Sequence, residues 1–241
     1  MPLEEIINRQ GIIISAPASG AGKTTVTLGL INAFARKGSV QPFKSGPDYI
    51  DSKFQSVAAD RPSYNLDTWA MSSSDILNMI GMVGPSDICI AEGSMGLFDG
   101  VISKGAGGNG STADLASITN WPVILVVDCA KQAQSVAALI TGFNSFRHDI
   151  TIGGVILNNI SSKRHEALVV SEVSKTKVPI LGVIPRSNEL TIPERHLGLV
   201  QAEDLSDLEQ LIFKLGTLIE ENCDLEAIAC TARKSSPAIP T

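Results

Sequence analysis

Short apolar segments alternate along the chain with longer segments in which apolar residues recur every three or four positions. The short segments predict strands at residues 11–16, 40–44, 87–92, 123–128, 152–158 and 180–184. Several of them are apolar throughout, which is typical of strands buried on both faces of a parallel sheet. We therefore expect an α/β fold with a mostly parallel, doubly wound sheet flanked by helices.

The longer segments predict helices at residues 22–37, 74–82, 111–119, 132–146, 163–175 and 206–222. In the last of these, the apolar residues share one face, and Ser206 followed by Glu209 has the form of a capping box. Residues 93–112 interrupt the alternation with repeated glycines. A loop of this length inside a compact domain is usually functional or disordered, so we expect a mobile loop beside a site.

Composition fits one large domain and excludes several functional classes. The chain has 241 residues, of which 44% are hydrophobic, and its net charge is −6. This apolar content excludes a disordered chain, and the acidic balance argues against nucleic acid as a partner. No apolar segment is long enough to cross a membrane. We expect a single domain over residues 1–231, followed by a linker or disordered tail over residues 232–241.

The cysteines and the start of the chain favour a cytoplasmic protein. No pair of cysteines has CxxC spacing, and Cys89 and Cys129 lie in apolar segments, which indicates buried, reduced thiols. The acidic start lacks the cationic and apolar regions of a signal peptide.

A phosphate-binding loop follows the first predicted strand. The usual pattern is GxxxxGK[ST], and here Pro17 stands at the first glycine while Gly22, Lys23 and Thr24 match. Backbone N–H groups of such a loop converge on phosphate oxygens at a helix N-terminus. Lys23 is expected to reach the β- and γ-phosphates of ATP, and the Thr24 hydroxyl to ligate Mg²⁺. The alternative, a turn of small residues ending in Lys-Thr by coincidence, leaves the preceding strand and following helix unexplained.

Acidic residues at strand ends are the candidates for holding Mg²⁺. Glu92 and Asp128 each end a predicted strand, and we choose Glu92 because it opens the glycine-rich loop. Asp128 is interpreted as a cap of the helix predicted at residues 132–146. After the second strand, the turn that begins at Gly46-Pro47 is expected to present Asp48 and Asp51 at the ligand-binding edge of the sheet.

Three motifs occur together and in order: APASGAGKTT at residues 16–25, KSGPDYID at 44–51 and EGSMGLFDG at 92–100. Together they resemble the ATP-binding half of cobyrinic acid a,c-diamide synthase, a family of cobalamin biosynthesis. The resemblance covers about residues 11–203. It implies a P-loop fold of the dethiobiotin synthetase type and the ATP-dependent amidation of the a and c carboxylates of cobyrinic or hydrogenobyrinic acid. An acyl phosphate is the implied intermediate.

The resemblance also implies roles for individual residues. The Mg²⁺ ligands would be Thr24, Asp48 and Glu92. The residues that bind nucleotide would be Ser19, Gly20, Ala21, Gly22, Lys23, Thr24, Thr25 and Asn158, with the Asn158 amide meeting the adenine edge. The catalytic set would be Lys23, Lys44, Tyr49, Asp51 and Asp99. Of these, Asp51 or Asp99 is the hypothetical acceptor of a proton from incoming ammonium.

The sequence departs from the family in lacking a glutamine amidotransferase domain, which would be the partner that supplies ammonia from a separate domain or subunit. The substrate would be a polycarboxylate tetrapyrrole (a corrinoid), and a homodimer is compatible with the sequence. Two alternatives stay open: a nickel-sirohydrochlorin a,c-diamide synthase, and a nucleotide-switched positioning ATPase without a covalent product. Ala18, where positioning ATPases carry a second lysine, argues against the latter. His196, Arg186 and Lys104 receive no role.

Overall fold

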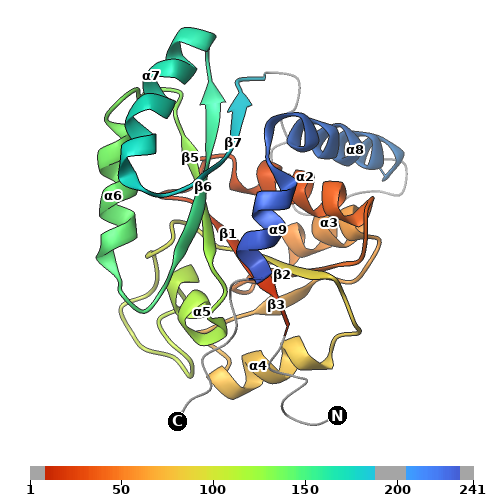
Figure 1. Ribbon diagram of the computed structural model, residues 1–241. Coiled ribbons are helices and arrows are strands. Elements are labelled where there is room, and N and C mark those ends of the chain that lie inside the picture. Colours follow the sequence, from red (N-terminus) through yellow and green to blue (C-terminus); the bar gives the residue numbers. More distant parts are fainter. Residues whose placement is uncertain (1–8, 188–204, 234–241) are drawn as a thin grey trace.

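A twisted, fully parallel sheet forms the centre of the protein, for which the computed structural model describes residues 9–187 and 205–233 (Figure 1). Within these residues the sheet has the strand order β3-β2-β4-β1-β5-β6-β7. The strands are β1 (Gly11–Ser15), β2 (Val40–Ser45), β3 (Tyr64–Leu66), β4 (Ile88–Glu92), β5 (Val123–Asp128), β6 (Ile152–Ile160) and β7 (Ile180–Pro185). The predicted parallel, doubly wound sheet is therefore confirmed, with β3 as an additional edge strand.

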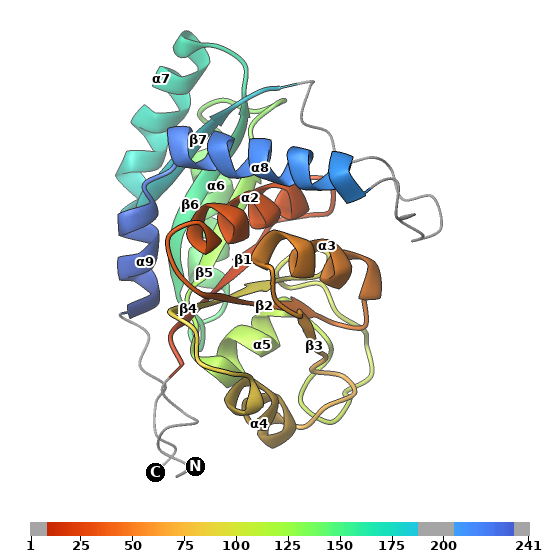
Figure 2. The same ribbon diagram turned by 90° about the vertical axis from the view of Figure 1, so that its right-hand side faces the viewer.

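Helices cover both faces of the sheet, as Figures 1 and 2 show. One face carries α2 (Lys23–Ala35), α3 (Tyr49–Ala59), α8 (Leu205–Asn222) and α9 (Leu225–Arg233). The other carries α4 (Ser73–Met82), α5 (Thr112–Thr119), α6 (Val136–Phe146) and α7 (Lys163–Val173), which a 3-10 turn, η1 (Ser174–Thr176), extends.

The alternation of side chains along each strand feeds two separate cores. Ile12 and Ile14 of β1 pack on the α2–α8 side, whereas Ile13 packs on the α4–α7 side, and all three are fully buried. Burying a side chain of this size stabilises the fold by roughly 1.5–3 kcal/mol. Because both faces are buried, the central strands need continuous apolar sequence, and this explains why the strand pattern could be seen in the sequence.

The segment after β2 differs from the predicted turn, because it forms helix α3. The Oδ1 atom of Asp48 accepts hydrogen bonds from the backbone N–H groups of Ile50 and Asp51, at 3.0 and 3.2 Å. Asp48 is thus the N-cap of α3, and Asp51 lies in the first helical turn rather than on an open turn. The N-cap fixes which residues of this segment face the sheet.

The interpretation of Asp128 as a helix cap is wrong. Helix α6 begins at Val136, with Ser135 as its N-cap residue. Asp128 ends β5, and its Oδ1 atom accepts bonds from the Ala130 N–H at 3.0 Å and from Nδ2 of Asn159 at 2.8 Å. Its carboxylate therefore connects the turn after β5 to the end of β6.

The glycine-rich segment between β4 and α5 is fastened to the loop after β3 by backbone bonds. The N–H groups of Ala106 and Gly107 donate to the carbonyls of Trp69 and Thr68, at 2.8 and 2.9 Å. A Cβ atom on Gly105 would lie 1.9 Å from the Trp69 carbonyl oxygen, so this approach requires glycine. The glycines therefore let the two loops pack backbone against backbone.

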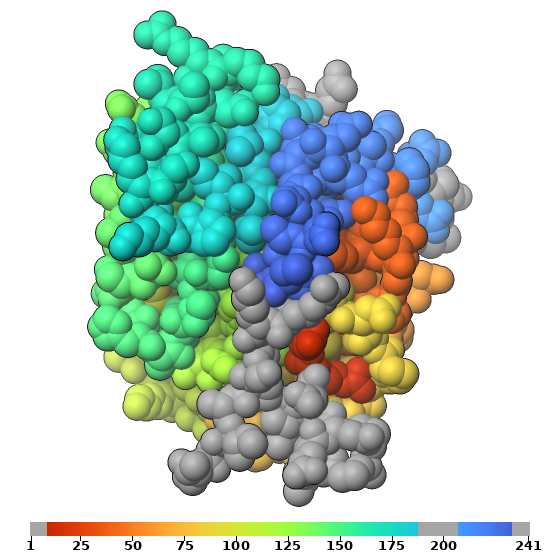
Figure 3. Space-filling view, viewed as in Figure 1, coloured from red at the N-terminus to blue at the C-terminus, as the bar shows by residue number. Residues whose placement is uncertain are grey.

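Helix α9 lies at the surface between the α7 side and the α2 side of the molecule (Figure 3). It includes the first two residues of the segment predicted as linker, and Ala232 is buried in the core. The rest of that tail, His196 and the side chain of Ser206 lie outside the described residues. None of the helices in the described part of the chain combines the length and hydrophobicity that crossing a bilayer requires.

Candidate functional site

The phosphate loop joins β1 to α2 at the carboxyl edge of the sheet. Gly20 and Gly22 have φ angles of 81° and 85°, in the left-handed region that favours glycine. Gly22 is the N-cap residue of α2, and no described side chain caps this helix by a hydrogen bond. The uncapped N-terminus, preceded by two left-handed glycines, has the arrangement that binds anionic groups such as phosphate.

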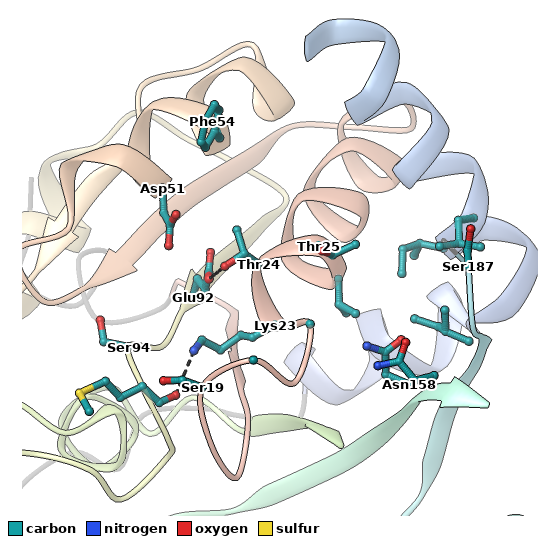
Figure 4. Close-up of a pocket in the computed structure, with 18 of the residues that line it drawn as sticks. Ser19, Lys23, Thr24, Thr25, Asp51, Phe54, Glu92, Ser94, Asn158 and Ser187 are labelled. Atoms are coloured by element: carbon teal, nitrogen blue, oxygen red, sulfur yellow. Dashed lines mark hydrogen bonds between the residues drawn. The ribbon is translucent and has the colours of Figure 1, made fainter. Parts of the chain in front are cut away.

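The two functional side chains of the loop reach toward the segment after β4. The ammonium group of Lys23 donates to the Met95 carbonyl at 2.9 Å, and the Thr24 hydroxyl donates to Oε1 of Glu92 at 2.7 Å (Figure 4). Strand pairing explains this proximity, because Glu92 lies beside Ile14 in the register of β1 and β4. The phosphate loop and the end of β4 therefore form one site.

Lys44 lies at the centre of a cluster of three carboxylates. Its Nζ atom is 2.7 Å from Oδ2 of Asp51, 3.2 Å from Oε1 of Glu92 and 3.9 Å from Oδ2 of Asp48. Lys44 and Glu92 are direct neighbours in the register of β2 and β4, and α3 supplies Asp51 from above the strand ends. Lys44, Asp51 and Glu92 are buried, so water screens these charges little.

The surroundings raise the pKa values of both Lys44 and Asp51. Burial opposes the charged form of Lys44, but the negative charges of Glu92 and Asp51 outweigh it and raise the pKa of Lys44. Burial and the nearby charge of Glu92 raise the pKa of Asp51, despite the opposing effect of Lys44. Three acids around one base leave an excess of negative charge, which suits a further cation.

Thr24 and Glu92 are a donor set that suits Mg²⁺ bound together with a nucleotide. Their oxygen atoms are already 2.7 Å apart at the N-terminus of α2, where phosphate oxygens are expected to complete the coordination. Within the described ranges, no group of three or more His, Cys, Asp or Glu residues has the arrangement of a self-contained metal site.

A cleft of about 940 Å³ runs along this edge of the sheet. The phosphate loop and the Lys44 cluster belong to its lining, and so do four apolar residues of β7 and α8: Ile184, Pro185, Leu218 and Ile219. Figure 4 shows Asn158 and Ser187 on one side of the phosphate loop, and Asp51 and Glu92 on the other side. The cleft therefore combines a polar, charged part with a largely apolar part, as a nucleotide requires.

Asn158 supports the phosphate loop from β6. Its Nδ2 atom donates to the Ala21 carbonyl at 2.9 Å, and the side chain is largely buried. A Cβ atom on Gly22 would lie 2.3 Å from the same nitrogen. The structure thus assigns the amide donor of Asn158 to the loop, whereas we expected the amide to face adenine.

The structure brings together most of the predicted site residues but not all of them. Those that line the cleft are Ser19, Gly20, Gly22, Lys23, Thr24, Thr25, Lys44, Asp48, Asp51, Glu92 and Asn158. Tyr49 is 73% exposed at the start of α3 and does not belong to the lining. Asp99 is also exposed, and its Oδ2 atom accepts from the Gly96 N–H at 2.9 Å, closing a turn. Arg186 and Lys104 are exposed outside the cleft.

Sequence analysis missed Gln55 and Phe54, which both lie on α3. Gln55 is fully buried and donates through Nε2 to Oε2 of Glu92 at 2.8 Å, while Phe54 lines the cleft. Had α3 been predicted, the spacing of four residues between Asp51 and Gln55 would have put both on one helix face.

Comparison with known proteins shows that the chain is similar to nucleotide-binding domains. The CobQ/CobB/MinD/ParA nucleotide binding domain family matches residues 12–200. The hydrogenobyrinate a,c-diamide synthase of Rhodobacter capsulatus is 46% identical over 92% of this chain and 52% of its own length. That of Brucella anthropi is 47% identical over 91% of this chain and 50% of its own. The chain thus spans about half the length of these curated relatives.

Solved structures share the fold at much lower identity. The MinC:MinD cell division protein complex of Aquifex aeolicus gives a TM-score of 0.50 and 18% identity, covering 96% of this chain and 98% of that one. FlhF complexed with GMPPNP and Mg²⁺ gives a TM-score of 0.51 and 13% identity, covering 86% and 75%. The family match spans most of the chain, including the phosphate loop and both acidic motifs. The chain therefore belongs to the CobQ/CobB/MinD/ParA nucleotide-binding domain family.

Proposed function

We propose that this chain is the ATP-dependent amidating part of a hydrogenobyrinate a,c-diamide synthase, a ligase that forms carbon–nitrogen bonds in cobalamin biosynthesis. The identity of 46–47% to curated proteins of that name, over more than nine-tenths of the chain, supports this function. The observation that carries it is the position of Lys44. This ammonium group stands within one cleft with the phosphate loop, where a substrate carboxylate and a γ-phosphate could both be held.

The reaction has two steps. In the first step, one carboxylate oxygen of the substrate attacks the γ-phosphorus of ATP, and the bond between the γ-phosphorus and the β,γ-bridging oxygen breaks. ADP departs, and the substrate carboxylate has become an acyl phosphate. Ammonia then attacks the acyl carbon, loses one proton and expels inorganic phosphate, which carries away that carboxylate oxygen. Phosphoryl transfer of this kind depends mainly on positioning and on neutralising charge.

The residues of the cleft have distinct proposed roles. Lys23 and the loop N–H groups hold the β- and γ-phosphates, and Thr24, Asp48 and Glu92 are the proposed Mg²⁺ ligands. When bound, Mg²⁺ would neutralise phosphate charge and orient the γ-phosphate. With the excess negative charge around it offset by bound Mg²⁺, Lys44 would steer the acceptor carboxylate. Asp51, 2.7 Å away, would hold the ammonium group of Lys44 in place.

Asp99 and Tyr49 remain proposed contributors from the rim, and Asn158 remains a proposed adenine contact in addition to its bond to the loop. The proposed source of ammonia is a glutamine amidotransferase domain or subunit. We place the reaction in the cytoplasm, because four free cysteines, of which Cys89 and Cys129 are buried, suit a reducing compartment.

The test is to incubate the purified chain with ATP, Mg²⁺, ammonium and hydrogenobyrinate and to read amide formation by mass. Two successive conversions of carboxylate to amide, each dependent on ATP, support the proposal. Cobyrinate and nickel sirohydrochlorin as parallel substrates identify the accepted ring. ATP turnover without an amide from any of the three would instead favour a nucleotide-switched ATPase.

A further inference from the structure

Gln55 is a polar side chain in the interior for which none of the roles above accounts. It lies on α3 with an exposed fraction of 0%, in contact with the carboxylate of Glu92. Its Nε2 atom donates to Oε2 of Glu92 at 2.8 Å, and its Oε1 atom accepts from the Ser63 hydroxyl at 2.8 Å. Both ends of the amide are therefore in use.

Electrostatics determine which end of this amide faces Glu92. If the amide were rotated by half a turn, its oxygen would face the carboxylate oxygen, and two acceptors would be buried against each other. The hydroxyl of Ser63 can donate to the amide oxygen, and this bond holds the nitrogen toward Glu92.

The two carboxylate oxygens of Glu92 have different partners. Oε1 accepts from the Thr24 hydroxyl at 2.7 Å and lies 3.2 Å from the ammonium group of Lys44. Oε2 is bonded to Gln55 on the other side. With Oε2 fixed, rotation of the carboxylate is restricted, and Oε1 stays directed at the phosphate loop.

We propose that Gln55 is a positioning residue for the Mg²⁺ that accompanies the nucleotide. It keeps the carboxylate of Glu92 oriented, with Oε1 facing Thr24, before the metal arrives. This inference rests on the proposed role of Glu92 as a Mg²⁺ ligand. Partners that orient a metal ligand typically change metal affinity by about 10- to 100-fold when they are removed.

The test measures metal binding without any turnover. Mn²⁺ is titrated into the protein in the presence of a non-hydrolysable ATP analogue, and free Mn²⁺ is followed by electron paramagnetic resonance. Gln55→Met keeps the length of the side chain but removes the donor, and we expect the dissociation constant for Mn²⁺ to rise about 10- to 100-fold. Binding of the analogue without divalent metal should stay as in the wild type. Unchanged Mn²⁺ affinity in this variant overturns the proposal.

Gln41 provides a matched control. It is equally buried, but its Nε2 atom donates to the carbonyls of Pro42 and Pro62. Gln41→Met should lower the stability and leave Mn²⁺ affinity unchanged, whereas an equal loss of affinity would overturn the proposal. If Gln55→Met does not fold, Ser63→Ala removes the orienting bond and should weaken Mn²⁺ binding to a smaller degree; unchanged affinity there counts against the proposal.

Glu92→Gln separates this inference from the function on which it rests. If Glu92→Gln binds Mn²⁺ like the wild type, Glu92 is no ligand and the role of Gln55 falls with it. Amide formation by the wild-type chain is read separately, so the two proposals can fail independently.

Discussion

The Nζ atom of Lys44 lies 2.7 Å from Oδ2 of Asp51, and both side chains are buried at the carboxyl edge of the sheet. Lys44 comes from β2 and Asp51 from the first turn of α3, so a single turn connects the two partners. The cap formed by Asp48 sets the start of α3 and thereby the position of Asp51. An ion pair so buried depends on both partners, because either charge alone would be poorly solvated.

Replacing Lys44 by Met should therefore destabilise the fold strongly. The change leaves Asp51 and Glu92 buried without the cation between them, and removing one partner of a buried pair costs about 3–5 kcal/mol. Urea unfolding measures the loss. The double variant Lys44→Met, Asp51→Leu should recover part of it, and equal midpoints for wild type and Lys44→Met would contradict the electrostatic role assigned here.

Gly22→Ala should weaken nucleotide binding more than Gly20→Ala does. Both residues have left-handed backbones, and a non-glycine residue there costs about 1–3 kcal/mol. A Cβ atom on Gly22 would also lie 2.3 Å from Nδ2 of Asn158, whereas one on Gly20 meets nothing within 4 Å. Titration with a fluorescent ATP analogue measures the affinity of each glycine variant. Equal affinities for the two glycine variants would refute the steric argument.

Asp99→Asn should retain ATP binding and lose amide formation if Asp99 takes a proton from incoming ammonium. Its exposed carboxylate accepts from the Gly96 N–H, a bond that an asparagine side-chain oxygen can also accept. The substitution therefore tests the charge while preserving the turn. Amide formation at the wild-type rate would leave Asp99 with a structural role only.

Asp87→Asn should show a pH-dependent effect on stability. Bonds from the backbone N–H and the hydroxyl of Ser39 lower the pKa of Asp87 and link the starts of β2 and β4. A lowered pKa in the folded state adds stability above the ordinary value of about 4, and this stability is lost as the pH falls through the folded value. Urea midpoints should thus differ near neutral pH and converge in acid. A difference that persists unchanged in acid would argue against this linkage.

Much of the fold was predictable because its strands are buried on both faces. The sequence of β1 is continuously apolar, as a buried strand requires. It is followed by the small residues of the phosphate loop, whose spacing is typical of phosphate binding at the start of a helix. Helix α3 was missed because most of its buried residues are polar (Asp51, Ser52 and Gln55), and because its start depends on the Asp48 cap. Local pattern also suggested that Asp128 caps a helix, but its partner Asn159 comes from the end of β6.

The arrangement of the site was less predictable than its members. Lys44 and Glu92 were each selected from the sequence, but their contact depends on the register between β2 and β4, which no local pattern encodes. The role of Gln55 depends on Ser63 and Glu92 together, and these come from different elements. Long-range pairing of this kind requires the assembled sheet.

The most direct test of the proposed chemistry follows oxygen from the substrate. Hydrogenobyrinate labelled with heavy oxygen in its carboxylates is incubated with the chain, ATP, Mg²⁺ and ammonium, and the inorganic phosphate is analysed by mass. If a carboxylate is activated as an acyl phosphate, each amide formed transfers one labelled oxygen to phosphate. Phosphate released without label would contradict carboxylate activation by this cleft.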